Sequence, residues 1–259
     1  MGSKFHLFFA FLNHWLKKED QYSQQSPFVF NLSQELRTYL RENKNGDPEI
    51  EQIRKNLLQN KSKIQVLDLG AGSLKVPEDT REIRKITQYS TSSAKIAQLF
   101  QFFCGKTPAQ NVIELGTCMG ISTQYLAKST IGRLFTLEGS EAISKEAQER
   151  NLAKNVQFLV GTIENELPKI LSSIPSVDFA LIDASHTYRS TKDFFELLSP
   201  KFHTKSICII GDIHWSKGME QAWKEIYQEP RVKLALDFFE CGVLLFENPG
   251  EKKTLIMDF

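Results

Sequence analysis

The fold is decided by the stretch VIELGTCMG at residues 112–120, an apolar run that leads into an acid and a glycine-rich turn. The apolar run predicts a strand over 111–115, and the residues after the turn predict a helix over 121–128. The next apolar run predicts a strand over 133–138 that ends in Glu138. The glycines of the turn allow the backbone to approach a ligand closely. A nucleoside site also needs an acid about 20 residues further on, and Glu138 meets that requirement.

The same alternation of strand and helix continues to the end of the chain. Apolar runs predict five further strands, at 156–160, 177–183, 206–212, 232–238 and 243–247. Amphipathic runs predict helices at 141–154, 188–198 and 217–227, and a short helix with Pro168 in its first turn. A turn at Cys241-Gly242 is expected between the last two strands. This order predicts an α/β fold with a doubly wound, Rossmann-like sheet of seven strands, mostly parallel, with an antiparallel last strand.

The composition excludes several classes of protein. The chain of 259 residues is 41% hydrophobic and 24% charged, as expected of a globular protein with a sizeable core. Its formal net charge of +1 shows no basic excess, so nucleic acid is not expected as a partner. The four cysteines are scattered without a CxxC pair, which disfavours a zinc site or a disulfide framework and favours a reducing, cytoplasmic location.

A second glycine-rich stretch, DLGAGS at residues 68–73, also follows an apolar strand. The window in which its acid would fall, 88–92, contains no Asp or Glu. We therefore expect an accessory strand and turn near the cofactor entrance, with a second cofactor site as the alternative. Neither glycine stretch has the form G-x-G-x-x-G, so a nicotinamide cofactor is disfavoured.

The order of these motifs resembles the class I S-adenosylmethionine-dependent methyltransferases. The resemblance spans about residues 90–247 and is carried by VIELGTCMG (112–120), LFTLEGS (134–140), VGTIENELP (160–168), VDFALIDASHTY (177–188) and IIGDIHW (209–215). It implies S-adenosyl-L-methionine as cofactor. The residues expected to contact its methionine part are Glu114, Gly116, Thr117 and Gly120. Glu138 is expected to hold the ribose, and the turn Gly161, Thr162 and Ile163 to meet the adenine; further expected contacts are Ser122, Gly139 and Asp183.

Acids and histidines follow the fourth and fifth strands of this series, in Asp183-Ala184-Ser185-His186 and Asp212-Ile213-His214. Ligands of such sheets bind beyond the carboxyl ends of the strands, so we expect these side chains to converge. Either histidine could act with Asp183 in catalysis, as the base that takes the proton of a hydroxyl acceptor. Alternatively, Asp183 and Asp212 hold Mg²⁺. In a plainer interpretation Asp183 only touches the cofactor and both histidines are structural.

The whole pattern resembles the O-methyltransferases of the catechol type and their sugar-modifying relatives, in which acids at these strand ends bind a divalent metal. One departure is Ile213, which stands where a further Asp or Asn is usual and so puts the metal in doubt. The Asn/Asp-Pro-Pro-aromatic signature of enzymes that methylate bases is absent after the fourth strand. A small-molecule acceptor is therefore expected, and not a nucleic acid.

The N-terminal part begins with the apolar stretch FHLFFAFLNHWL at residues 5–16. This stretch is too short to span a bilayer, so we expect no stable membrane insertion. A docked amphipathic helix is expected, with a membrane-surface or partner-binding helix as the alternative. A further helix is expected over 33–41 with Ser33 as N-cap. Residues 1–88 are predicted to form an accessory or lid segment, mostly helical with a short strand near 64–70, and residues 89–259 the methyltransferase domain.

The sequence thus predicts a methyltransferase that transfers a methyl group in line to a small-molecule hydroxyl, aided by a His base, a divalent metal or both. The N-terminal segment would serve as a lid or as the contact of a homodimer. Two alternatives remain open. One is a scaffold that binds the cofactor without catalysis, and the other is a protein or lipid methyltransferase recruited by the N-terminal helix.

Overall fold

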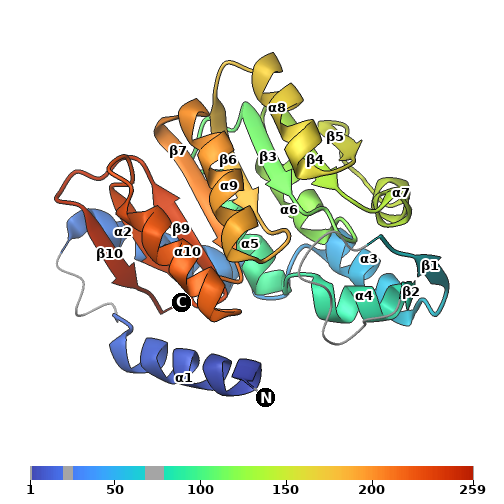
Figure 1. The fold of residues 1–259 in the computed structure, drawn as a ribbon, viewed down its shortest axis with the longest axis horizontal. Coiled ribbons are helices and arrows are strands. Elements are labelled where there is room, and N and C mark those ends of the chain that lie inside the picture. The colour runs from blue at the N-terminus through green and yellow to red at the C-terminus, as the bar shows by residue number, and fades with distance from the viewer. Residues whose placement is uncertain (1, 20–25, 68–78, 259) are drawn as a thin grey trace.

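The computed structural model describes residues 2–19, 26–67 and 79–258, and DLGAGS at 68–73 lies outside them. Its centre is an eight-stranded sheet in the order β10-β8-β9-β7-β6-β3-β4-β5, with helices on both faces (Figure 1). The strands are β3 Asn111–Leu115, β4 Arg133–Glu138, β5 Val156–Val160, β6 Val177–Ile182, β7 Phe202–Gly211, β8 Leu234–Asp237, β9 Cys241–Leu245 and β10 Lys253–Ile256. The predicted Rossmann-like α/β fold is confirmed.

The sheet differs from the prediction at its C-terminal edge. β9 is antiparallel to both β7 and β8, as expected, but β10 adds an eighth strand parallel to β8. The turn predicted at Cys241-Gly242 is wrong, because these residues begin β9 and the turn lies before them, where Phe239 has a φ of 69°. A Cβ on Gly242 would lie 2.5 Å from the Trp223 ring, so this glycine makes room for the ring.

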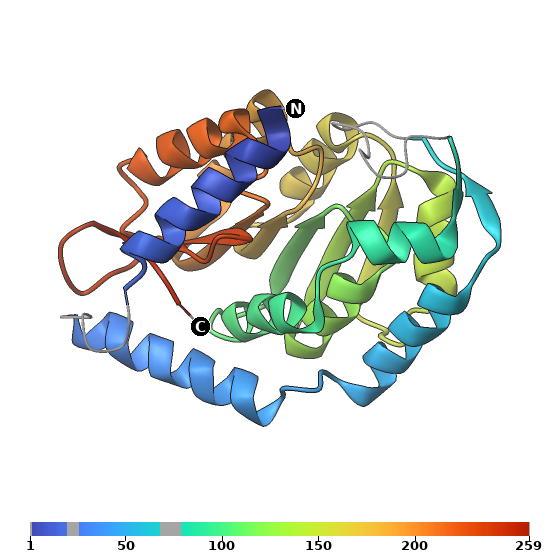
Figure 2. The same cartoon turned by 90° about the horizontal axis from the view of Figure 1, so that it is seen from below.

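Alternate residues of the strands face two different cores, which is why the strands read as continuous apolar runs. On one face, residues such as Val112 and Leu181 pack with the helices α2 (Pro27–Glu42) and α5 (Ala94–Cys104). On the other face, residues such as Ile113 and Ala180 pack with α8, α9 and α10 (Figure 2). The helices that follow the first five of these strands, together with the helix before them, are α5 Ala94–Cys104, α6 Ile121–Ser129, α7 Glu141–Glu149, α8 Ile163–Ser173, α9 Tyr188–Leu198 and α10 Lys217–Gln228. A 3-10 turn, Ser199–Lys201, precedes β7.

Two predicted helices have different bounds in the structure. The helix expected over 141–154 ends at Glu149, and Asn151 turns the chain by bonding its side chain to Ala153. Pro168 is the sixth residue of α8 and not in its first turn, because the helix already begins at Ile163.

The N-terminal segment consists of α1 Gly2–Lys17, α2 Pro27–Glu42, α3 Pro48–Gln59, the antiparallel pair β1 Lys63–Gln65 and β2 Thr80–Glu82, and α4 Ile83–Ser90. α2 begins at Pro27 with Ser26 as N-cap, so the predicted start at Ser33 is wrong. Proline at the first helical position and a capping serine before it favour this earlier start. Ser33 is buried inside the helix.

Helices α3 and α4 pack against the part of the sheet that carries the glycine-rich turn. They share one core with residues of α5, α6, α7 and the turn, including Ile50, Leu57, Ile83, Ile86, Ala97, Met119, Ile121 and Ile143. Because Met119 lies inside the turn 116–120, burial of α3 and α4 also fixes that turn.

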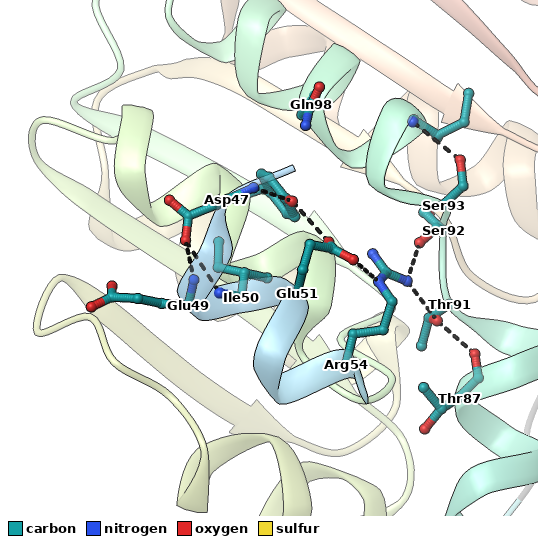
Figure 3. A network of polar contacts seen from close by, with 12 residues as sticks. Asp47, Glu49, Ile50, Glu51, Arg54, Thr87, Thr91, Ser92, Ser93 and Gln98 are labelled. Carbon is teal, nitrogen blue, oxygen red and sulfur yellow. Dashed lines mark hydrogen bonds and ion pairs between the residues drawn. The ribbon is translucent and has the colours of Figure 1, made fainter. Parts of the chain in front are cut away.

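A polar network joins α3 to the helix behind the turn (Figure 3). The Tyr125 hydroxyl accepts a hydrogen bond from the Asp47 backbone N–H at 2.9 Å and donates to Glu51 at 2.8 Å. Arg54 donates to Glu51 at 2.9 Å and to the Ser92 carbonyl at 2.7 Å. The network ties α3 to α6 and to the residues that precede α5.

Candidate active site

The ends of β3, β4 and β5 lie side by side, as a nucleoside site in this fold requires. The Gly116 and Thr117 N–H groups donate to the Leu137 carbonyl at 3.0 and 3.2 Å. The Gly161 N–H donates to the Glu138 carbonyl at 3.0 Å. These bonds bring the glycine-rich turn, the acid of β4 and the turn after β5 to one edge of the sheet.

The carboxylate of Glu138 is aimed at the glycine-rich turn. Its Oε2 accepts a hydrogen bond from the Cys118 N–H at 3.0 Å, and its Oε1 accepts one from the Ser140 N–H at 2.9 Å. The turn around Gly116 and the acid 22 positions later thus meet directly. This is the juxtaposition on which the predicted cofactor site depends.

The predicted cofactor residues fall into two groups by exposure. Half-buried residues, whose atoms reach the surface of the site, are Gly116, Glu138, Gly139, Gly161, Thr162, Ile163 and Asp183. Buried residues, which shape the turn from behind, are Glu114, Thr117, Gly120 and Ser122. Contact of either group with a cofactor stays a prediction.

Glu114 is the centre of the buried group. Its carboxylate accepts hydrogen bonds from the hydroxyls of Ser122 at 2.6 Å, Thr123 at 2.6 Å and Thr136 at 2.7 Å. Thr136 also shares a 2.6 Å hydrogen bond with Thr117. Burial raises the pKa of Glu114 to about 7, although the three hydroxyls oppose the shift. Glu114 therefore ties β3, β4 and α6 together beneath the turn.

Two glycines of the turn are required by the backbone itself. Gly116 has a φ of +102°, and a Cβ there would lie 2.3 Å from the Asp183 carbonyl oxygen. Gly120 has a φ of +74°, and its Cβ would lie 3.0 Å from the Cβ of Ala147. Positive φ and this close approach both favour glycine, so both positions of the turn require it.

The ends of β6 and β7 bring together Asp183, His186 and Asp212, as predicted. One ligand atom from each lies within 4.8 Å of the others. The His186 Nε2 is 3.7 Å from Asp212 Oδ2. Burial raises the pKa of Asp183 to about 6; nearby His186 opposes this shift and the carboxylate of Asp212 adds to it.

Strained backbone holds this cluster in place. Ser185, His186 and Asp212 have φ values of 62°, 41° and 53°, which side chains other than glycine rarely adopt. Strain of this kind persists only where the surrounding structure enforces it, and it gathers at functional sites. Ile213 is fully buried, so the third oxygen ligand of the resembled enzymes has no counterpart at that position.

His214 is placed differently from His186. Its Nδ1 lies 2.9 Å from Glu220 Oε1 and its Nε2 lies 2.9 Å from Asp237 Oδ2. Burial alone would lower the pKa of His214, but the two carboxylates outweigh burial and raise it. With both ring nitrogens held by carboxylates, this geometry favours a structural role, and a role of His214 as base stays a prediction.

Sequence reasoning missed the partners of His214. Asp237 ends β8 and Glu220 lies in the first turn of α10. Asp237 also lies 3.3 Å from the Nε2 of His14, which comes from α1. No spacing rule links these four residues, because His14, Glu220 and Asp237 come from three separate elements, α1, α10 and β8.

The fold and this edge of the sheet are those expected of a class I methyltransferase. Residues 113–213 match the family described as a methyltransferase domain, and no curated protein matches the chain. This match supports the predicted identification as a methyltransferase enzyme of class I.

Solved structures share the fold. An O-methyltransferase from Bacillus cereus, in complex with SAH, is 19% identical, with a TM-score of 0.54, 81% of this chain and 99% of that chain covered. A putative O-methyltransferase from Klebsiella pneumoniae is 15% identical, with a TM-score of 0.57 and coverages of 83% and 97%. The O-methyltransferase TomG from Streptomyces achromogenes, in complex with SAM, is 16% identical, with a TM-score of 0.52 and coverages of 61% and 82%.

Proposed function

We propose that the protein transfers the methyl group of S-adenosyl-L-methionine to a hydroxyl of a small molecule. One observation carries the proposal. The glycine-rich turn and Glu138 meet at one part of the sheet edge, and the cluster of Asp183, His186 and Asp212 lies at the next two strand ends. A nucleoside site and a group of titratable side chains thus adjoin, as a methyl donor and its acceptor require.

The residues on the donor side fit the cofactor. Glu138 offers two carboxylate oxygens to a ribose diol, and the half-buried turn 161–163 lies beside it to meet the adenine. Gly116 lets the turn pass close to the backbone of Asp183, while Glu114 fixes the turn from below. When bound, S-adenosyl-L-methionine supplies a methyl group on a sulfonium. The chain contributes orientation of the donor and acceptor for in-line transfer.

The residues on the acceptor side make the hydroxyl nucleophilic. We assign proton transfer to His186, which would take the hydroxyl proton at Nδ1 while Nε2 faces Asp212 at 3.7 Å. Asp212 would then stabilise the charged imidazole, and Asp183 would hold the acceptor in position. His214 receives a positioning role here, because its nitrogens already face Asp237 and Glu220.

The same cluster also fits a divalent metal, because two carboxylates and one imidazole converge within 4.8 Å. Asp183, Asp212 and His186 would hold the ion, and His186 would supply the ligand that Ile213 cannot. When bound, Mg²⁺ or a similar ion would lower the pKa of the acceptor hydroxyl as a Lewis acid. In that arrangement His186 is a ligand and the ion replaces the base.

Other features of the chain have a place in the proposal. In this proposal residues 1–88 are an accessory segment, of which α3 and α4 support the turn through the shared core and the network of Figure 3. The four cysteines are free thiols, which supports a cytoplasmic location. Two alternatives stay in view, a cofactor-binding scaffold without catalysis and an enzyme recruited to its acceptor by α1. In the small-molecule methyltransferase the N-terminal segment would serve as a lid or as the contact of a homodimer.

Calorimetry tests the donor side. The wild-type protein is expected to bind S-adenosylhomocysteine, and Glu138→Ala to bind it at least about 10-fold more weakly, since a charge-assisted hydrogen bond contributes about 1.5 kcal/mol or more. Glu141→Ala, in the first turn of α7, serves as a control that removes a nearby exposed carboxylate. Equal affinity of Glu138→Ala and wild type would contradict the assignment of the ribose site.

Methyl transfer to a panel of phenols, catechols and sugars tests the acceptor side. Activity that falls in His186→Ala and survives a chelator supports the base, whereas activity lost to the chelator and restored by Mg²⁺ supports the metal. Binding of the cofactor without transfer to any acceptor would favour the scaffold. Turnover of His186→Ala and Asp212→Ala at the wild-type rate would show that the acceptor lies elsewhere.

A further inference from the structure

Helix α1 is held to the protein by one side only. His14 lies 3.3 Å from Asp237 and 3.2 Å from its carbonyl oxygen, and His6 lies 3.8 Å from Glu220. Ala10, between the two histidines, is buried. Positions 6, 10 and 14 are spaced by four residues and so form one narrow stripe along the helix. Figure 2 shows α1 alongside α10, which carries Glu220.

The opposite side of α1 exposes a wide apolar face. Its large side chains and their exposed fractions are Phe5 65%, Phe8 60%, Phe9 61%, Leu12 38%, Trp15 54% and Leu16 68%. Phe11, which is 53% exposed, lies at the edge of this face, and its ring packs edge-on against Phe239. In Figure 1 the outer side of α1 is covered by no other element of the described chain. A soluble protein rarely exposes such a continuous patch unless something binds to it.

We propose that this face of α1 binds the surface of an anionic lipid bilayer. The sixteen residues of the helix include Lys4 and Lys17 but no Asp or Glu, so their charge complements acidic headgroups. Phe and Trp make up most of the exposed face, and aromatic rings are well suited to the boundary between headgroups and acyl chains. The helix would lie in the plane of the membrane with its histidine side still on the protein.

The helix would lie on the bilayer without crossing it. Sixteen residues extend about 24 Å, less than the hydrocarbon core of about 30 Å. Among the residues that the structure describes, no helix combines the length and apolar character that a membrane span requires. The docked side of α1 also keeps Asp237 and Glu220 as polar partners.

A second copy of the chain is a less suitable occupant of this face. A second copy would have to present a groove that matches this convex row of side chains, because interfaces between proteins are closely packed. A lipid surface needs no matching shape, and it accommodates a convex row of aromatic side chains. The dimer is therefore an outcome to be recognised in the test.

Vesicle co-sedimentation tests the proposal with the full chain. Wild-type protein is expected to bind vesicles of phosphatidylglycerol and phosphatidylcholine, and to bind pure phosphatidylcholine or high-salt samples more weakly. The double variant Phe8→Ser/Phe9→Ser should lose about 100-fold in partitioning, about tenfold for each side chain. Ile131→Ser, which replaces an apolar side chain 73% exposed elsewhere, should bind as wild type. A blue shift of tryptophan emission on vesicles should disappear in Trp15→Phe.

Two results would overturn the proposal. One is wild-type protein that stays in the supernatant with anionic vesicles. The other is a dimer, found by light scattering, that Phe8→Ser/Phe9→Ser dissociates, which would make the face a contact between copies. Calorimetry with S-adenosylhomocysteine on the same samples checks that each variant is folded. It also separates this proposal from the proposed function, since cofactor binding and vesicle binding can fail independently.

Discussion

Replacing Gly211 with alanine moves one carboxylate of the candidate site without removing any titratable group. Gly211 ends β7, and a Cβ there would lie 2.0 Å from Asp183 Oδ1 and 2.8 Å from its Cγ. Ordinary van der Waals contact begins near 3.4 Å. The Asp183 oxygen must therefore move by about 1.4 Å, the difference between those distances.

The displacement should reduce turnover far more than stability. A misplacement of about 1 Å at a reacting centre costs on the order of 100-fold in rate, so we expect kcat/KM to fall by about that factor. The Asp183 side chain can rotate away, at a cost of about 0.5 to 1.5 kcal/mol for a strained rotamer. Alanine in a strand stabilises the folded protein by roughly 0.5 to 1 kcal/mol relative to glycine. The two effects nearly cancel, and Tm should change by only a few degrees.

Steady-state kinetics with an acceptor from the panel, calorimetry with S-adenosylhomocysteine and a thermal melt together make the assay. Gly218→Ala is the matched control, because its Cβ would meet Tyr188 at an ordinary 3.4 Å. Wild-type kinetics in Gly211→Ala, with an unchanged melt, would refute the idea that the position of Asp183 matters. A loss of S-adenosylhomocysteine binding equal to the loss of turnover would instead place Asp183 on the cofactor.

Two further predictions concern stability. The pKa of Glu114 is raised from 4.5 to about 7, so its protonated form is favoured by folding, and stability should fall as pH rises from about 4.5 through 7. Urea denaturation should show the free energy of unfolding of the wild type, relative to that of Glu114→Gln, falling by about 2 to 3 kcal/mol between pH 5 and pH 8. Parallel pH profiles of the two proteins would contradict this prediction. Tyr125→Phe leaves the Asp47 N–H without its acceptor and should cost about 1 to 3 kcal/mol in the same assay, whereas Tyr39→Phe removes a hydroxyl that only donates to Gln101 and should cost less. Equal losses in the two tyrosine variants would mean that the network of Figure 3 does not anchor α3.

The strands of the first half of the domain could be predicted because their signals are local. The runs at 111–115, 133–138 and 156–160 are bounded by turn residues, and the structure begins and ends these strands there. Consecutive parallel strands are usually neighbours, so the meeting of Gly116 and Glu138 also followed from chain order. Local reasoning failed at Gly242, where glycine makes room for Trp223 and does not mark a turn.

The partners of side chains could not be predicted in the same way. His186 and Asp212 follow adjacent strands, so their approach was foreseeable, but its 3.7 Å geometry depends on strained φ angles that no pattern encodes. His214 pairs with Asp237, which lies 23 positions later on a strand that β9 separates from β7. Only the complete sheet order brings those two residues together.

The placement of β9 has a consequence for biosynthesis. β8 pairs with β9 and β10 but not with β7, so it has no place in the sheet until the chain has been made as far as Leu245. Helix α1 in turn docks on Asp237 and Phe239, beside that late edge. Helix α1 therefore cannot dock until the chain has been made at least as far as this edge of the sheet, and until then its aromatic residues are open to chaperones.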